Sequence, residues 1–207
     1  MIKSLDVLKM FRDNEKAEIG AYITTYQKIE LGFIVNIYGN KGSGKTFTAL
    51  QEITGMNFNM FYVDVLNEHT PFKMLNSIYN QLFHKNKSMV GSNETKLTDD
   101  IINNVPTETI IILDNMETFK EDKQKKGRGF KLMLERLTNS NILLFLIWNT
   151  NKTPTISNRN IFFKDYTKEE KKIILNTMFN NPVICYDKTL KENIINITFE
   201  NELKKLI

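Results

Sequence analysis

Cysteine is nearly absent from this sequence, which has a single one, Cys185, in 207 residues. One cysteine cannot build an intramolecular disulfide framework or supply the paired thiolates of a zinc ribbon. Long apolar runs are also missing, because the longest, 110–113 and 142–148, fall far short of the ~20 residues that cross a bilayer. The start of the chain lacks the basic-then-apolar order of a secretory signal. We therefore expect a soluble, intracellular protein with no membrane partner.

A strong charge of either sign is lacking as well. Lys and Arg number 28 against 24 Asp and Glu, a formal net charge of +4, which permits an anionic partner without requiring one. Hydrophobic residues make up 41% and charged residues 25%, as in ordinary globular proteins, so a wholly disordered or fibrous chain is excluded. The length fits one domain with a small appendage.

Segments with the patterns of β-strands and α-helices alternate along most of the chain, which predicts a parallel α/β fold. Two short amphipathic helices are expected within residues 2–26, with a break near Asp13 and Asn14. From residue 168 onward the pattern is helical only, which predicts a small helical appendage. The expected strands are 32–38, 60–65, 109–114, 142–148 and 161–163, and the other expected helices are 45–53, 71–83, 97–102, 130–137, 169–179 and 190–206.

The most specific motif is a glycine-rich loop between the first strand and the next helix. Backbone N–H groups of such a loop surround phosphates, and the helix N-terminus adds partial positive charge. The motif's lysine reaches the β- and γ-phosphates, and its hydroxyl residue ligates Mg²⁺. We therefore expect ATP and Mg²⁺ as cofactors. The loop matches G-x-x-x-x-G-K-T with Gly39, Asn40, Lys41, Gly42, Ser43, Gly44, Lys45 and Thr46.

A carboxylate at the end of a nearby buried strand usually completes such a site. Asp114 ends the apolar run 110–113, so we expect it to act with Thr46 on the Mg²⁺ side. The following residue, Asn115, is an amide and a poor general base, which predicts slow or absent hydrolysis. Glu117 and Glu135 are alternative bases, although each is also explained as a solvated surface charge.

The polar pair Asn149 and Thr150 follows the strand 142–148, beside the expected nucleotide. Either residue would suit the orientation of a water molecule or a contact with the γ-phosphate, and ordinary turn residues are the alternative reading. His69 and His84 stand apart from other metal-ligating residue types, so no metal other than Mg²⁺ is expected.

Taken together, the motifs resemble the AAA+ ATPases of the origin recognition complex and the cell-division-cycle-six family over nearly the whole chain. The resemblance implies a P-loop AAA+ fold: a parallel five-stranded sheet flanked by helices in residues 1–165, and a small C-terminal helical lid in residues 166–207. It assigns Asn149 as sensor one, and it places Tyr166 near the nucleotide and Lys204 in sensor two, where an arginine is usual. The segments that carry it are FRDNE (11–15), IYGNKGSGKT (37–46), FYVDVLNEHTPFKMLNSIYNQL (61–82), LFLIWNTN (144–151), FKDYTKEEKKIIL (163–175) and NELKK (201–205).

The same resemblance implies an ATP-binding subunit of a nuclear DNA replication initiator, in which nucleotide acts mainly as an assembly switch. Its partners would be other AAA+ subunits, with DNA contacted through the complex. Asn115 makes subunit five of the origin recognition complex the best match. Arg136 is a candidate for the arginine that reaches a neighbouring subunit's nucleotide, with a plain surface arginine as the alternative reading. The chain ends at Ile207, so we expect no winged-helix domain.

Two other functions stay open at this point. A signalling or plasmid-maintenance ATPase would share the loop and bind a protein partner, and FKDYTKEEKKIIL favours the replication family over it. A small-molecule kinase would usually carry arginines in its lid, yet none occurs from Tyr166 onward. The charged cluster KEDKQKKGR at 120–128 is either a route to DNA phosphates or a solvated loop.

Overall fold

The computed structural model describes residues 11–84, 93–119 and 128–179. It divides the chain into Asn14–Lys164 and a second unit that combines Met1–Asp13 with Asp165–Ile207, and the two are described separately here. Several features expected from the sequence lie outside the described residues: Cys185, Lys204, the helix at 190–206 and nearly all of the charged cluster at 120–128.

Strands and helices alternate through the first unit, as predicted, and most boundaries fall within three residues of the expected ones. The helix α1 runs without interruption from Asp13, so the break expected near Asp13 and Asn14 is the beginning of a helix. The other helices are α2 (Lys45–Thr54), α3 (Pro71–Phe83), α4 (Glu94–Asn104) and α5 (Arg128–Asn139), with α1 spanning Asp13–Ile29. The strands are β1 (Ile34–Gly39), β2 (Asn59–Asp64), β3 (Thr109–Asp114), β4 (Ile142–Asn149) and β5 (Asn160–Phe163), and a 3-10 turn, η2 (Met116–Thr118), follows β3.

The predicted five-stranded parallel sheet is confirmed, with strand order β2-β3-β4-β1-β5. Since the strands are parallel, their carboxyl ends meet at one edge of the sheet, which is where ligands bind in open α/β folds. The register brings Asp64 opposite Asp114 and Gly39 opposite Asn149 at that edge. The expected phosphate loop and its candidate partners therefore meet at one end of the sheet.

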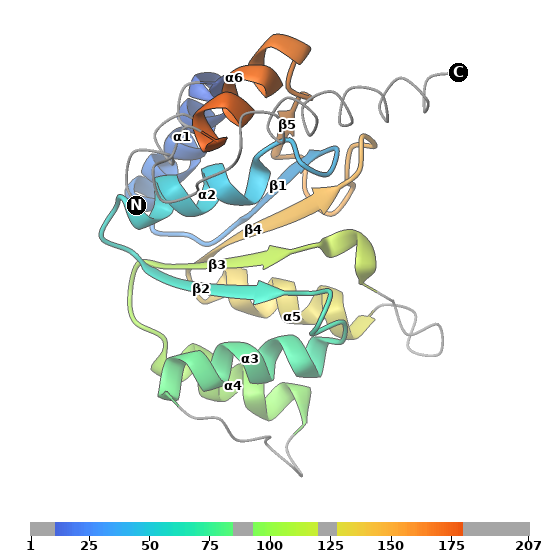
Figure 1. The fold of residues 1–207 in the computed structure, drawn as a ribbon. Helices are drawn as coiled ribbons and strands as arrows, with labels where there is room; N and C mark the ends of the chain where they lie inside the picture. The colour runs from blue at the N-terminus through green and yellow to red at the C-terminus, as the bar shows by residue number, and fades with distance from the viewer. Residues whose placement is uncertain (1–10, 85–92, 120–127, 180–207) are drawn as a thin grey trace. The chain divides into compact units, whose positions relative to one another are not determined.

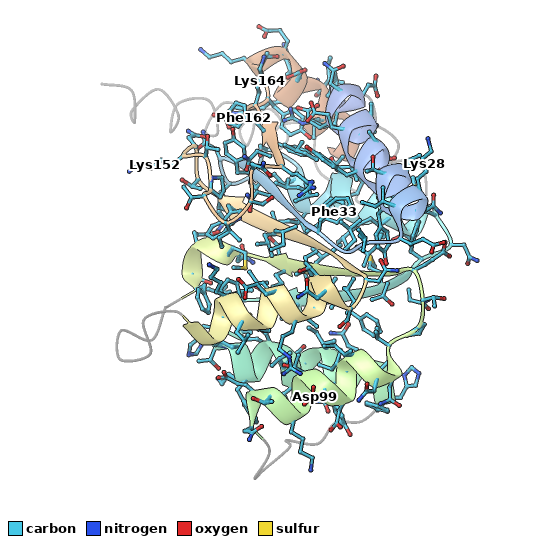
Figure 2. All side chains as sticks on the ribbon, turned by 180° about the vertical axis from the view of Figure 1, so that it is seen from behind. Lys28, Phe33, Asp99, Lys152, Phe162 and Lys164 are labelled. Atoms are coloured by element: carbon cyan, nitrogen blue, oxygen red, sulfur yellow. The ribbon has the colours of Figure 1, made fainter. Side chains whose placement is uncertain are left out.

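Helices cover both faces of this sheet. Figure 1 shows α1 and α2 over one face and α3, α4 and α5 over the other, and a separate hydrophobic core fills each interface. In the view of Figure 2, Phe33 lies inside the layer under α1, whereas Lys28, Lys152 and Lys164 point outward. None of the helices in the described ranges has both the length and the apolar content that a bilayer crossing needs.

Side-chain caps fix where two of the helices begin. The Thr70 hydroxyl accepts a hydrogen bond from the Lys73 amide at 3.3 Å and precedes Pro71, which suits a first helical position. The Asn93 side chain accepts a bond from the Lys96 amide at 2.8 Å. This cap explains why α4 begins at Glu94, three residues before the expected helix at 97–102.

The free edge of β2 carries one unusual feature. Gln81 of α3 accepts a hydrogen bond from the Tyr62 backbone N–H at 3.2 Å and donates one to the Tyr62 carbonyl at 2.8 Å. A side-chain amide therefore occupies the two backbone groups that a neighbouring strand would use.

In the second unit, the described residues comprise the end of the N-terminal segment and α6 (Lys168–Phe179). The buried Arg12 guanidinium lies 3.9 Å from the centroid of the Tyr166 ring, and Phe11 meets the same ring edge-on at 6.4 Å. Thr167 and Glu170 form a capping box at the start of α6, in which each side chain accepts a bond from the other's backbone N–H. These contacts join residues 11–12 to the segment that leads into α6.

Two leucines of α5 test the position of the core. Leu134 is 3% exposed, whereas Leu132 on the same helix is 54% exposed. Leu134→Ala should lower the free energy of unfolding by ~2–5 kcal/mol, because the lost methyl groups leave a cavity. Leu132→Ala changes helix propensity equally and should stay within about 0.5 kcal/mol of wild type. Urea unfolding measures both, and equal losses would contradict this assignment of the core face.

Candidate functional site

The loop between β1 and α2 has a backbone that glycine alone readily adopts. Gly39 has φ of 151° and Gly44 has φ of 88°, both in the region that side chains disfavour. A Cβ atom added at Gly39 would lie 2.3 Å from the carbonyl oxygen of Phe163 in β5. Lys41 is exposed on the outer turn, while Ser43 is buried and donates its amide to the Asn40 carbonyl at 3.3 Å. The loop therefore bends back against the sheet, with its glycines at the turns.

The N-terminus of α2 differs from those of α3 and α4. Among the described residues, no side chain caps α2, and its first turn contains no acidic residue. The first N–H groups of a helix have no partner within the helix, and the helix dipole makes this end partially positive. These donors are therefore available to an anion held by the loop.

Lys45, the first residue of α2, places its ammonium group inside the loop. Its Nζ donates to the Gly39 carbonyl at 3.0 Å, to the Asn40 carbonyl at 2.7 Å and to the Ser43 hydroxyl at 3.3 Å. The side chain is buried, so its charge is directed at the loop rather than at bulk water. Neutral oxygens bind an ammonium group less strongly than phosphate oxygens do, which makes these contacts exchangeable for an anion.

Asp114 at the end of β3 connects the loop to the sheet. Its Oδ2 accepts hydrogen bonds from the Thr46 hydroxyl at 2.8 Å and the Tyr62 hydroxyl at 2.9 Å. Its Oδ1 accepts one from the backbone N–H of Asn115 at 2.7 Å. The two expected Mg²⁺ ligands, Thr46 and Asp114, are thus in direct contact. Hydroxyl and carboxylate oxygens are the ligands that Mg²⁺ prefers. The described residues contain no group of three or more His, Cys, Asp or Glu arranged to hold a metal, so Thr46 and Asp114 are the candidate protein ligands here.

The phenol of Tyr62 is held in its neutral form by this environment. Burial raises its pKa above the usual value of a tyrosine, and the neighbouring charge of Asp114, the hydrogen bond to Asp114 and the charge of Asp64 raise the pKa further. Tyr62 therefore remains a hydrogen-bond donor to the buried carboxylate over the whole physiological pH range.

A chain of side-chain hydrogen bonds runs across the carboxyl ends of β2, β3 and β4. Asn115 donates its Nδ2 to Asp64 Oδ1 at 2.8 Å and accepts, through Oδ1, a bond from Asn149 Nδ2 at 2.8 Å. The same Asn149 Nδ2 donates to Glu117 Oε1 at 2.8 Å, and the Asn149 backbone N–H donates to Glu117 Oε2 at 2.9 Å. Asn149 lies opposite Gly39 in the sheet, so this chain ends beside the phosphate loop.

The other residues singled out from the sequence differ in how they relate to the site. Glu135 is exposed on α5, where Lys131 approaches it at 3.7 Å, so of the two alternative bases only Glu117 joins the site. Thr150 forms an isolated antiparallel bridge with Gly39 of the phosphate loop, so it lies beside that loop. Its hydroxyl accepts a bond from the Lys152 backbone N–H at 3.1 Å, as turn residues commonly do. His69 and His84 are exposed, and Tyr166 belongs to the second unit.

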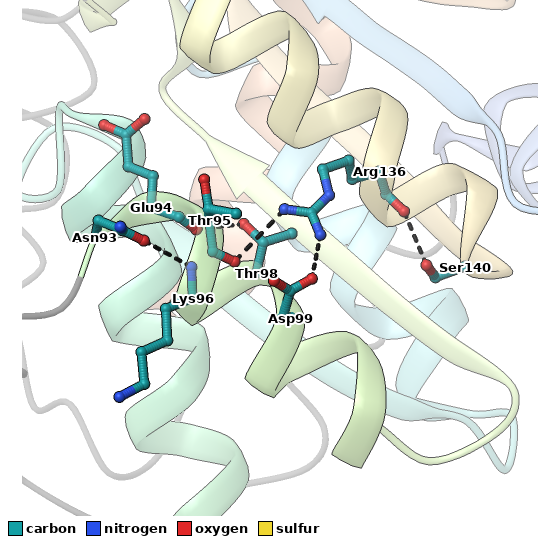
Figure 3. A network of polar contacts seen from close by, with 8 residues as sticks. All are labelled: Asn93, Glu94, Thr95, Lys96, Thr98, Asp99, Arg136 and Ser140. Carbon is teal, nitrogen blue, oxygen red and sulfur yellow. Dashed lines mark hydrogen bonds and ion pairs between the residues drawn. The ribbon is translucent and has the colours of Figure 1, made fainter.

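Arg136, the candidate contact to a neighbouring subunit, is engaged within its own unit. Figure 3 shows its guanidinium directed at α4, where it forms an ion pair with Asp99 and lies 3.5 Å from the Thr95 carbonyl oxygen. The pair joins α5 to α4 on the face of the sheet opposite α2.

Tyr62 and Asp64 belong to the site but were not among the residues expected from the sequence. Both lie on β2, which was recognised as a strand but not as a source of site residues. The pattern that identified Asp114, an apolar strand ending in aspartate, also occurs in residues 60–64. The position of Tyr62 two residues before that aspartate gave no comparable indication.

Comparison with protein-family models finds a match over residues 35–172, which include the loop, Asp114 and Asn149. The matching model is the ATPase family associated with various cellular activities, AAA. The chain belongs to this family. No curated protein sequence gives a significant match to this AAA ATPase.

Solved structures of Cdc6 and ORC proteins have similar folds. The Cdc6p protein of Pyrobaculum aerophilum has a TM-score of 0.62 at 14% identity, with 81% of this chain and 49% of that one covered. The ORC2 protein of Aeropyrum pernix, solved as ADPNP–ADP complexes, has 0.66 at 15%, covering 87% and 56%. Drosophila ORC bound to DNA has 0.61 at 17%, covering 86% and 50%. This AAA ATPase therefore spans about half the length of these chains. At identities this low, the likeness shows the fold alone.

The raised pKa of Tyr62 predicts how this AAA ATPase responds to alkaline pH. Removing the phenolic hydroxyl in Tyr62→Phe should cost roughly 1 kcal/mol of unfolding free energy at neutral pH, because a hydrogen bond to Asp114 is lost. Above about pH 10 an unfolded tyrosine loses its proton while folded Tyr62 keeps it, so this contribution should shrink as pH rises. Urea unfolding of both proteins between about pH 8 and pH 11 measures the difference. A difference that does not change over this range would contradict the assignment.

Proposed function

We propose that this AAA ATPase binds ATP with Mg²⁺ at the phosphate loop. The observation that carries the proposal is the junction of loop and sheet, where buried Lys45 lies against the loop oxygens and Thr46 contacts the buried Asp114 carboxylate. With nucleotide bound, Lys45 exchanges loop oxygens for phosphate oxygens, and the N–H groups of residues 39–46 hold the phosphates. Thr46 and Asp114 would hold Mg²⁺. The bound metal would supply polarisation of the phosphates.

Hydrolysis is proposed to be slow or absent. Asn115 stands next to Asp114 but carries an amide, which has no proton-accepting form near neutral pH. Its Nδ2 donates to Asp64 and its Oδ1 accepts from Asn149, so hydrogen bonds within the protein already use both ends of the amide. The nearby carboxylates, Asp64 and Glu117, also accept hydrogen bonds from the protein. Each of these groups is therefore already hydrogen-bonded within the protein, which makes it a poor general base for the attacking water.

The larger role that we propose is that of a subunit of a nuclear DNA replication initiator similar to the origin recognition complex. Nucleotide would act as a switch that favours assembly with other AAA+ subunits, and DNA would be contacted through the complex. The support is the combination of family membership, folds like those of Cdc6 and ORC proteins, and the sequence motifs. Asn115 makes subunit five the proposed counterpart.

The second unit is proposed to form the helical lid over the nucleotide, from residue 166 onward. In this assignment Tyr166 and Lys204 contact the nucleotide. The capping box that begins α6 and the packing of Arg12 on Tyr166 provide an ordered start to such a lid.

Lys45→Ala tests nucleotide binding. ATP with Mg²⁺ at about 100 times its dissociation constant should stabilise wild type by ~2.7 kcal/mol, and Lys45→Ala should lose most of this effect. Lys73→Ala removes the same charge from an exposed position on α3 and should respond like wild type. Thermal unfolding with and without MgATP measures the shifts.

Phosphate release in the same samples tests the proposal of slow hydrolysis. Turnover by wild type should lie well below the ~1 to 10³ s⁻¹ that is usual for enzymes. Turnover within that range would show that another group replaces the missing carboxylate. The absence of any MgATP effect on wild-type stability would overturn the binding proposal itself.

The assembly role is tested in the cells that express the protein. Chemical cross-linking of the tagged full-length chain, followed by mass spectrometry, should recover other AAA+ replication subunits with wild type and fewer of them with Lys45→Ala. Equal recovery of these subunits by both proteins would argue against a nucleotide switch. Recovery of signalling proteins in their place would favour the partner-binding ATPase.

A further inference from the structure

We propose that Glu117 is a positioning residue that holds the Asn149 amide away from the nucleotide and thereby makes the site discriminate against ATP relative to ADP. The proposal rests on nucleotide binding at the phosphate loop. It concerns which hydrogen bonds of Asn149 must break when a third phosphate enters the site.

The contacts of Asn149 show how its amide is held. The Asn149 side chain has two N–H donors, and they are directed to Asn115 Oδ1 and Glu117 Oε1, each at 2.8 Å. Glu117 also accepts a hydrogen bond from the Asn149 backbone N–H at 2.9 Å, so one carboxylate makes two hydrogen bonds with the same residue. A phosphate oxygen could receive an N–H from Asn149 only if one of these acceptors gave it up.

The contact between Glu117 and Asn149 lies close to the phosphate loop. Asn149 lies opposite Gly39 across β1 and β4, and Lys45 Nζ donates to the Gly39 carbonyl. The lysine of this loop type reaches the β- and γ-phosphates, so in this proposal the terminal phosphate would approach the strand end at which Asn149 is paired with Gly39. A third phosphate therefore brings extra negative charge towards the Glu117 carboxylate, which disfavours it.

The backbone around Glu117 keeps the carboxylate in place. Asn115 has φ of 59° and ψ of 40°, a left-handed conformation that turns the chain out of β3. Met116 is buried in the core, and the Thr118 hydroxyl donates to the Asn115 carbonyl at 2.7 Å. The turn is thus anchored on both sides of Glu117, whose own side chain is exposed. Substitution of an exposed side chain here should leave the fold intact.

The test compares ATP and ADP binding by Glu117→Gln and wild type, by calorimetric titration with Mg²⁺ present. Glutamine keeps the size of the side chain, removes its charge and can accept only one of the two Asn149 bonds with its single oxygen. The Kd for ATP should fall by about tenfold, as expected when a charge-assisted hydrogen bond and a like-charge repulsion are removed. The Kd for ADP should change by less than about twofold. The fluorescence of Trp148, the protein's single tryptophan and the neighbour of Asn149, gives a second readout.

Two further variants separate a positioning role from a general effect of charge. Glu135→Gln makes the same charge change on α5, outside the site, and should leave both affinities unchanged. In an Asn149→Ala background, Glu117→Gln should lose the part of its effect on ATP that acts through the Asn149 amide and keep only the smaller part due to direct charge repulsion.

The outcomes distinguish this inference from the proposal on which it rests. Binding of both nucleotides with an ATP/ADP ratio unchanged by Glu117→Gln overturns the inference and leaves the binding proposal standing. Weaker ATP binding by Glu117→Gln, or the same effect of that change in the Asn149→Ala background, also overturns it. Wild type that binds neither nucleotide overturns both proposals.

Discussion

The hydrogen bonds that converge on Asp114 are the contacts on which the arrangement of the site depends. This carboxylate is almost fully buried, and a buried charge is stable only when donors surround it. Its donors come from the start of α2, from β2 and from the backbone of Asn115, so one side chain fixes the relative position of three segments. The ends of β2 and β3 and the phosphate loop are consequently built around a single negative charge.

The sequence was sufficient for those features that depend on local pattern. The strand at 109–114, the helix at 71–83 and the phosphate loop are each encoded in consecutive residues, and they occur where they were expected. The relation between Asn149 and Gly39 depends instead on the register of two strands that are over 100 residues apart. The hydrogen bond from Tyr62 to Asp114 and the ion pair of Arg136 with Asp99 depend on the same kind of distant pairing. Apolar periodicity carries no information about such pairs, so the sequence alone could name members of the site but not their partners.

The amide of Asn115 has a structural role that a carboxylate at the same position could not take. A glutamate at this position would place a charged carboxylate against Asp64. The hydrogen bond that Asn115 Nδ2 now donates to Asp64 would be lost, because a carboxylate has no N–H. With asparagine, the amide joins two strands, and the negative charge stands two residues later, at Glu117. A negative charge thus lies near the loop at Glu117, while the residue next to Asp114 is a hydrogen-bonded link between β2 and β4.

The pairing of Gln81 with the backbone of Tyr62 bears on how the protein behaves in a crowded solution. An edge strand with free N–H and C=O groups is a template for the strands of other molecules, and such pairing leads to aggregation. Here a side chain of α3 mimics a peptide unit and ends the ladder in the middle of β2. The backbone groups in the central part of this strand are thus already hydrogen-bonded within the protein, which disfavours the addition of a strand from another molecule to the sheet.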